Sequence, residues 1–315
     1  MRDDEYLSLI KSTIVRSGIR PIPGARAVGA TLSVLAPRLA ARLAARLFLT
    51  PPRHRRPEPE IRALSTARPR AIDVGGRRVQ TWAWGVGPAV LLMHGWAGRG
   101  AQLAAFVEPL LARGCSVVTF DAPAHGDSEG RQATLRDLAA TLRAVAAMHG
   151  PVHGVIAHSL GAVATARAVH EGLTAHALVF LGAPADLVTP SLVFAEALGL
   201  SRRVRELMRQ RVEQRVGAPW EAFDVTRLAP GQAGPLLVVH DRDDAEVPWQ
   251  HGAAIAAAWP NTKLLTTGGL GHRRILRDPT VLATAVAFIA RRSAEAAEPT
   301  RASGVRAEPT PALAS

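Results

Sequence analysis

Short apolar runs alternate with helical patterns along most of the chain, and this alternation restricts the possible folds more than any other feature. The β-rich runs are bounded by Gly or Pro and lie at residues 71–74, 78–84, 89–93, 116–120, 152–157, 177–181, 236–239 and 263–266. Helical stretches separate most of them, at residues 101–112, 134–148, 160–171, 249–258 and 279–291. Strands that alternate with helices build a parallel sheet, and Gly75 and Gly76 indicate that an antiparallel hairpin precedes it. We therefore predict an α/β fold with a mostly parallel eight-stranded sheet and helices on both faces.

One connection between predicted strands, residues 185–234, is much longer than the others. Loops in α/β units usually span about 2 to 6 residues, so this stretch is an insertion. It contains helical periodicity of its own near residues 189–198 and 201–216. We expect a helical cap here, inserted into a core formed by residues 70–184 and 235–292.

The two ends of the chain differ from this core, and residues 1–69 combine an amphipathic helix with a basic linker. The helix is predicted from Thr31 to Leu49, where one apolar stripe and one basic face recur at helical spacing. These residues are Leu32, Leu35, Leu39, Leu43, Leu47, Arg38, Arg42 and Arg46. Repeated Pro predicts an extended linker at residues 53–59. Residues 293–315 lack periodicity and predict a disordered tail.

The leucine stripe of the N-terminal helix could pack on the core or lie on an anionic membrane surface. Phe48 is its only aromatic residue, whereas interfacial anchors usually carry Trp or several Phe. Monomers seldom leave such an apolar stripe in water. We therefore expect the stripe to be buried against the body, near the cap or the sheet edge, with peripheral membrane contact as the alternative.

The formal net charge of +12 raises the question of a nucleic-acid partner. Residues 1–70 hold 14 Lys and Arg against 5 Asp and Glu, while the rest of the chain holds 24 against 21. The excess therefore belongs to the N-terminal segment, whose only aromatic residues are Tyr6 and Phe48. Because stacking platforms for bases are missing, we expect no nucleic-acid partner.

The length of the apolar runs, the charge of the first residues and the number of cysteines indicate the compartment and exclude some kinds of metal site. No apolar run reaches the roughly 18 to 20 residues of a membrane span, and acidic residues stand at positions 3–5, where a secretory signal is basic. A cytoplasmic protein is the expectation. Cys115 is the only cysteine, which excludes an internal disulfide and a Cys-based metal site.

The sharpest local motif is an apolar strand that runs through Ser159 directly into a helix. It reads Val155-Ile156-Ala157-His158-Ser159-Leu160-Gly161-Ala162. A nucleophile elbow needs this arrangement, with small residues two positions before and after the serine so that strand and helix can approach closely. Ala157 and Gly161 are those small residues. The alternative is a serine that only caps the helix.

With this elbow, residues 70–290 resemble the α/β-hydrolase superfamily, although Ala157 stands where the usual motif has Gly. The resemblance implies an oxyanion loop at His94-Gly95-Trp96, with the backbone amides of Trp96 and Leu160 as donors. It also implies that the turn from Asp121 to Ser128 is structural, and that its His125 is no catalytic base.

The same resemblance implies a catalytic acid and base after the elbow. The acid of the family follows the strand-end His by four residues and precedes a Pro by four, and Asp244 meets both spacings, with Asp243 as the alternative. Asp241 and Glu246 are then loop charges. Among eleven histidines, His272 alone follows the last strand, within a glycine-rich loop. The chain order Ser, Asp, His is that of the superfamily.

These residues predict a serine hydrolase, most simply a carboxylesterase acting on a small-molecule ester without cofactor or metal. Thioesterase, acyltransferase, cofactor-free haloperoxidase and C–C hydrolase chemistry keep the same serine and stay open, as does a non-catalytic scaffold. One apolar set in the cap could line an acyl pocket or merely dock the cap onto the body. Its members are Leu192, Val193, Phe194, Leu198 and Leu200.

Overall fold

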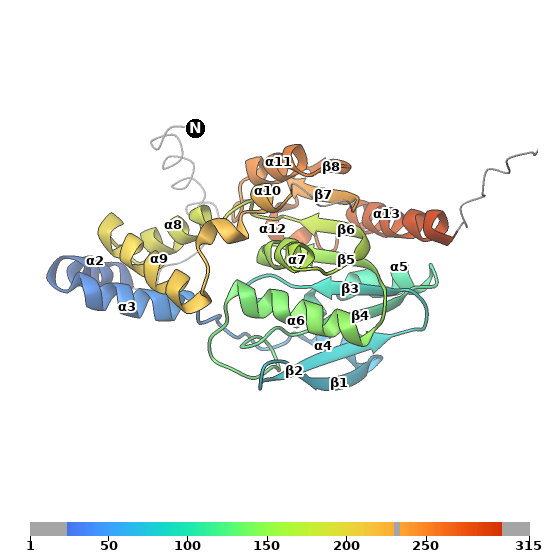
Figure 1. The fold of residues 1–315 in the computed structure, drawn as a ribbon, viewed down its shortest axis with the longest axis horizontal. Helices are drawn as coiled ribbons and strands as arrows, with labels where there is room; N and C mark the ends of the chain where they lie inside the picture. The colour runs from blue at the N-terminus through green and yellow to red at the C-terminus, as the bar shows by residue number, and fades with distance from the viewer. Residues whose placement is uncertain (1–23, 230–233, 298–315) are drawn as a thin grey trace, which may run out of the picture.

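An eight-stranded sheet forms the centre of the computed structural model, which describes residues 24–229 and 234–297 (Figure 1). The strands are β1 (Arg68–Asp73), β2 (Arg78–Trp84), β3 (Ala89–Met93), β4 (Ser116–Phe120), β5 (Val152–His158), β6 (Ala175–Leu181), β7 (Leu236–Asp241) and β8 (Thr262–Thr267). They lie in the order β1-β2-β4-β3-β5-β6-β7-β8. Strand β2 pairs antiparallel with β1 and β4, and all other pairs are parallel. The predicted mostly parallel sheet and its entry hairpin are confirmed.

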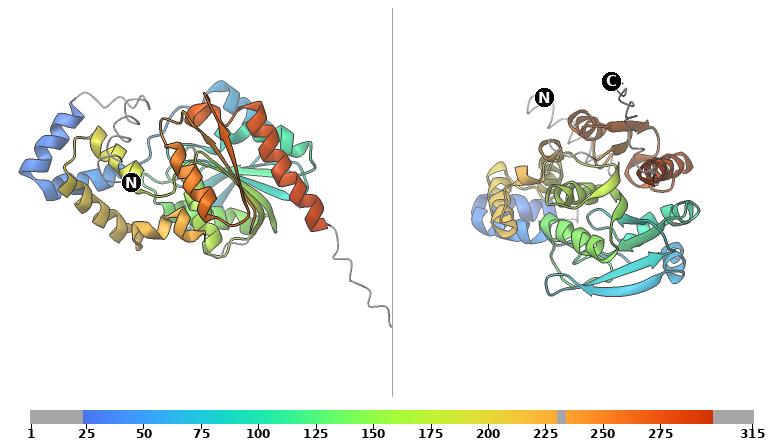
Figure 2. Two further views of the ribbon diagram at one scale, coloured as in Figure 1. Left: turned by 90° about the horizontal axis from the view of Figure 1, so that it is seen from above. Right: turned by 45° about the vertical axis from the view of Figure 1, so that its right-hand side comes forward.

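Helices cover both faces of the sheet, as the alternating pattern predicts (Figure 2). One face carries α6 (Leu135–Met148), α7 (Leu160–His170) and α11 (Trp249–Ala258). The other carries α4 (Glu58–Ser65), η1 (Gly100–Phe106), α5 (Val107–Leu111) and α13 (Pro279–Ala297). Alternate residues of β3 serve the two cores: Leu91 and Met93 pack with the first set, and Val90 and Leu92 with the second. Burial on both faces explains why the central strands read as continuous apolar runs.

The long connection between β6 and β7 holds helices close to the expected positions. They are α8 (Val188–Ala197), α9 (Arg202–Val216), η2 (Trp220–Phe223) and α10 (Val225–Leu228). Ser201 accepts a hydrogen bond from the Val204 amide and caps α9, which ends at Gly217 with φ 71°. Helices α8 and α9 lie at one end of the molecule beside the N-terminal helices (Figures 1 and 2).

The N-terminal region contains two helices where one was predicted from Thr31 to Leu49. They are α2 (Ala25–Leu35) and α3 (Pro37–Phe48), separated at Ala36, which has φ −146° and ψ 64°. Pro37 has no N–H to donate and restricts the preceding residue, so the helix breaks there and Pro37 opens a new first turn. The three- and four-residue spacing of the leucines continues past Ala36, so hydrophobic periodicity alone does not reveal the break between the two helices.

Helix α3 packs on α9, but the expectation that its leucine stripe is buried is wrong. The buried residues of α3 are Ala40, Ala41, Ala44 and Ala45, whereas Leu39, Leu43 and Leu47 are exposed. Small side chains let two helices approach closely, so the alanine face makes the contact. Phe48 adds contacts to α8 and η2, with its ring 5.1 Å from the Phe194 ring and 6.0 Å from the Trp220 ring.

The predicted extended linker at residues 53–59 is held against the core and ends early, because α4 begins at Glu58. Arg56 donates to the buried carboxylate of Asp121 at 2.9 Å and to Asp127 at 2.7 Å. Pro at the second position of α4 suits a helix start, where the missing N–H costs no hydrogen bond.

At the other end, α13 continues to Ala297, so residues 293–297 of the predicted disordered tail are helical. Their Ala and Glu favour helix. The rest of that tail, residues 298–315, lies outside the described residues, as do residues 1–23. Among the helices that the structure describes, none combines the length and apolar character needed to cross a membrane.

Candidate active site

Ser159 lies at a sharp turn between β5 and α7. Its backbone has φ 54° and ψ −130°, a conformation that a non-glycine residue adopts only when the surroundings enforce it. Its side chain makes no capping hydrogen bond to α7, which argues against the alternative that Ser159 only caps this helix. A Cβ at Gly161 would collide with the carbonyl of His94, so this small residue lets α7 pack against the end of β3.

The loop after β3 runs directly beside this turn. A Cβ placed on Gly95 would lie 2.8 Å from Cβ of Ser159 and 3.4 Å from its Oγ, so only glycine fits at this approach. Leu160 is the first residue of α7, and its N–H therefore has no acceptor within the helix. Gly95, Trp96 and Ser159 line one cavity, and Leu160 follows Ser159 directly but is not in the described lining.

His272 and Asp244 meet across the loops that follow β8 and β7. His272 lies in the short helix α12 (Gly271–Arg274), and its Nδ1 is 2.7 Å from Oδ2 of Asp244. The other oxygen of Asp244, Oδ1, accepts the amides of Glu246 and Val247, both at 2.8 Å. The loop after β7 therefore fixes the carboxylate, and the carboxylate orients the imidazole.

The two groups stabilise each other's charged forms. Burial acts to raise the pKa of Asp244, but hydrogen bonds from His240 and His272 outweigh it and hold that pKa below its usual value. Burial acts to lower the pKa of His272, yet the hydrogen bond and the charge of Asp244 raise it above the ordinary 6.5. The ionised carboxylate accepts the Nδ1–H of His272, which leaves Nε2 as the basic nitrogen.

The other carboxylates of this loop form hydrogen bonds or ion pairs with groups other than His272. Asp241 accepts Thr267 Oγ1 at 2.7 Å and the Leu270 amide at 3.1 Å. Asp243 accepts the Gly269 amide at 2.8 Å, and Glu246 pairs with Arg273 at 2.9 Å. Of the four carboxylates predicted in this loop, the one that contacts His272 is Asp244.

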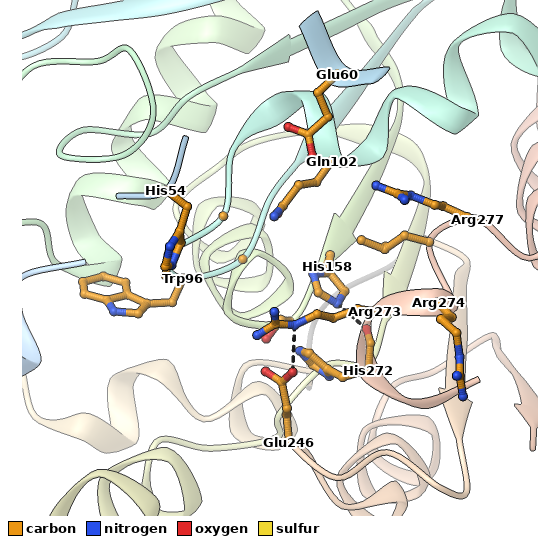
Figure 3. Close-up of a pocket in the computed structure, with 15 residues that line it drawn as sticks. His54, Glu60, Trp96, Gln102, His158, Glu246, His272, Arg273, Arg274 and Arg277 are labelled. Atoms are coloured by element: carbon orange, nitrogen blue, oxygen red, sulfur yellow. Dashed lines mark hydrogen bonds and ion pairs between the residues drawn. The ribbon is translucent and has the colours of Figure 1, made fainter. Parts of the chain in front are cut away.

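Ser159 and His272 both line a cavity of about 350 Å³ (Figure 3). Polar and charged side chains make up much of its wall. They are His54, Glu60, Gln102, His158, Glu246, Arg273, Arg274 and Arg277. Figure 3 shows Glu60 and Gln102 on one side and Glu246 and His272 on the other, while the Arg274 side chain turns away.

The apolar set predicted as a possible acyl pocket lies elsewhere. None of those five residues is in the described lining of this cavity. Phe194 contacts Phe48, and Leu200 packs on the cluster formed by Ala40, Ala41 and Val204. At these two positions, the side chains dock the insertion onto the N-terminal helices.

Sequence reasoning missed His158, which precedes Ser159. Its Nε2 lies 2.9 Å from the carbonyl oxygen of His272, and the two rings are 4.6 Å apart. Burial lowers the pKa of His158 to about 3, so the neutral ring donates to that carbonyl and holds the backbone of His272. The sequence showed that His158 directly precedes Ser159, but the elbow motif allows any residue type at this position and so gave no signal for a role.

The turn after β4 packs against the loop that follows β3. Asp121 accepts the amides of Gly100 and Asp127, both at 2.8 Å. The buried His125 ring lies 5.2 Å from the Trp96 ring and is not in the described lining of the cavity. Among the described residues, no group of three or more His, Cys, Asp or Glu is arranged to hold a metal ion.

Comparisons with known proteins agree with this architecture. The model of the alpha/beta hydrolase family matches residues 90–285. A putative lipase from Acinetobacter baumannii is 15% identical, with 74% of this chain and 94% of that chain covered at a TM-score of 0.59. Est1E from Butyrivibrio proteoclasticus, solved with ferulic acid, is 20% identical, with 72% and 98% covered at 0.57. The esterase Pf2001 of Pyrococcus furiosus is also 20% identical, with 78% and 98% covered at 0.57. No curated protein matches the chain.

Proposed function

Because the chain belongs to the alpha/beta hydrolase family, we propose that it is a serine hydrolase that cleaves carboxylic esters. The observation that carries the proposal is the 2.7 Å contact between His272 and Asp244 beside a cavity that Ser159 and His272 share. Nucleophile, base and orienting acid thereby come from three separate loops at the same edge of the sheet.

In this mechanism, Ser159 Oγ attacks the ester carbonyl carbon while Nε2 of His272 takes the hydroxyl proton. The amides of Trp96 and Leu160 donate to the carbonyl oxygen as it gains negative charge. The C–O bond to the alcohol then breaks, and His272 returns the proton to the leaving oxygen. Water attacks the acyl-enzyme with His272 as base, which releases the carboxylic acid and restores Ser159.

The cavity favours short acyl groups. Its wall carries charged side chains, and the apolar residues of the insertion are used in packing at Phe194 and Leu200. A long alkyl chain would gain little from such a wall, since transfer free energy scales with the apolar area buried. We therefore expect kcat/KM to be highest for acetyl and butyryl esters and to fall for longer chains.

Labelling with a fluorophosphonate followed by an ester chain-length series tests the proposal. The wild-type protein should be labelled and should hydrolyse p-nitrophenyl acetate, whereas S159A should lose both properties with an unchanged circular dichroism spectrum. Loss of one triad member typically costs orders of magnitude in rate. Near-normal turnover by S159A would refute the nucleophile, and turnover of thioesters above esters would move the proposal to thioester chemistry.

A further inference from the structure

Helix α3 presents two different faces. Its four alanines are buried on the side that packs on α9, while Leu39, Leu43 and Leu47, on another side of the helix, are 48%, 43% and 54% exposed. Four-residue steps place these leucines on one line along the helix. The helix is thus fixed to the protein by its small residues, and its large apolar residues remain accessible.

Helix α2 extends the accessible apolar surface. Val34 is 80% and Leu35 76% exposed, and Val28 is also exposed. Helices α2 and α3 form the end of the molecule that lies farthest from the sheet (Figures 1 and 2). Several large apolar side chains exposed at one end of a molecule are typical of a site of interaction.

Basic side chains accompany the leucines. Arg38, Arg42 and Arg46 each precede one leucine of the stripe, and all three are exposed. Within the part of the chain that the structure describes, none of their guanidinium groups forms an ion pair. We call the three arginines with Leu39, Leu43 and Leu47 the arginine–leucine face. It offers uncompensated positive charge next to apolar side chains.

We propose that the arginine–leucine face binds the surface of an anionic lipid bilayer. Leucine side chains can enter the boundary between headgroups and acyl chains while arginines meet lipid phosphates, and two such signals together give stable attachment. A second copy of the chain fits less well, because a two-fold contact would bring equal rows of arginines together. The proposal is independent of the hydrolase chemistry.

Vesicle flotation with the full chain tests this surface. The protein should float with vesicles of phosphatidylcholine and phosphatidylglycerol, bind pure phosphatidylcholine weakly, and be released at about 1 M salt, where screening acts within about 3 Å. R38Q/R42Q/R46Q should weaken binding roughly a hundredfold, since each basic residue near an anionic bilayer contributes roughly fivefold. L39Q/L43Q/L47Q, which keeps helix propensity, should weaken it at least about tenfold.

The matched control removes the same charge elsewhere. R70Q/R113Q/R131Q substitutes three exposed arginines outside α2 and α3 and should bind vesicles as the wild type does. Hydrolysis of a soluble ester should be equal in all three variants, which separates this test from that of the proposed function. Equal weakening by the control would overturn the proposal, because attraction would then follow net charge alone.

Two other possible occupants of the arginine–leucine face would give different experimental results. If residues 1–23 cover this face, L39Q/L43Q/L47Q should lower the melting temperature, and the wild type should not bind vesicles. If a second copy covers it, the same variant should convert a dimer into a monomer in light scattering, again without vesicle binding by the wild type. Either result overturns the membrane proposal.

Discussion

Oδ2 of Asp244 and Nδ1 of His272 lie 2.7 Å apart, although the two residues belong to loops after different strands. Strands β7 and β8 are parallel neighbours, so their carboxyl ends deliver both loops to the same edge of the sheet. The Glu246 and Val247 amides hold the second oxygen of Asp244. The orientation of His272 is therefore set by a carboxylate that has little freedom to move.

This relationship predicts unequal effects of two neighbouring substitutions. D244N should lower kcat for p-nitrophenyl acetate by about 10⁴-fold, because an amide at this position stabilises the wrong imidazole tautomer. D243N should stay within about twofold of wild type, since Asp243 accepts only a loop amide there. Steady-state kinetics on both variants provides the check. The reverse ranking would assign the acid to Asp243.

The raised pKa of His272 predicts the acid limb of the pH profile. In the proposed mechanism the neutral imidazole is the base, so log kcat/KM should rise with slope one as pH increases and level off above a midpoint higher than 6.5. The residual activity of D244N should show a lower midpoint, because the charge that raises the pKa is gone. A midpoint that D244N leaves unchanged would mean that another group controls the limb.

The fold was largely predictable because its central strands are buried on both faces and separated by helices of ordinary length. The break between α2 and α3 was missed, since the leucine spacing runs unchanged past Ala36 and only Pro37 signals it. The side of α3 that is buried could not be read from periodicity. Leucines and alanines both recur at helical spacing, and the partner α9 decides between them.

His272 contacts Asp244 and lines one cavity with Ser159, but the rest of the cavity wall was not foreseen. His54 comes from the N-terminal linker and Glu60 from α4, far in sequence from Ser159. Their positions depend on long-range ion pairs, such as Arg56 with Asp121, for which local sequence carries no signal. Motif spacing locates groups at strand ends, whereas docking of separate segments depends on the three-dimensional surface.

The close approach at Gly95 predicts that G95A damages the site. The added methyl group would lie 2.8 Å from Cβ of Ser159, so the loop or the elbow must shift and misplace the Trp96 amide. We expect kcat to fall by at least about 10²-fold, the loss typical of one oxyanion donor. The control is G268A, whose methyl group would meet no atom nearer than 3.9 Å. Equal activity of both variants would show that the loop tolerates the methyl group.

Glu60 of α4 and Arg99 before η1 predict a large stability difference between two similar substitutions. Their side chains are 5% and 10% exposed and form two contacts, one of them 3.0 Å long. E60Q leaves a buried guanidinium without its counter-charge and should lower the free energy of unfolding by about 3 kcal/mol. Glu58 on the same helix pairs with Arg62 at 3.8 Å, with both side chains about two-thirds exposed. E58Q should therefore change stability by less than about 0.5 kcal/mol. Urea denaturation of the two variants gives both values, and a loss from E60Q no larger than that from E58Q would show that the buried pair does not anchor α4.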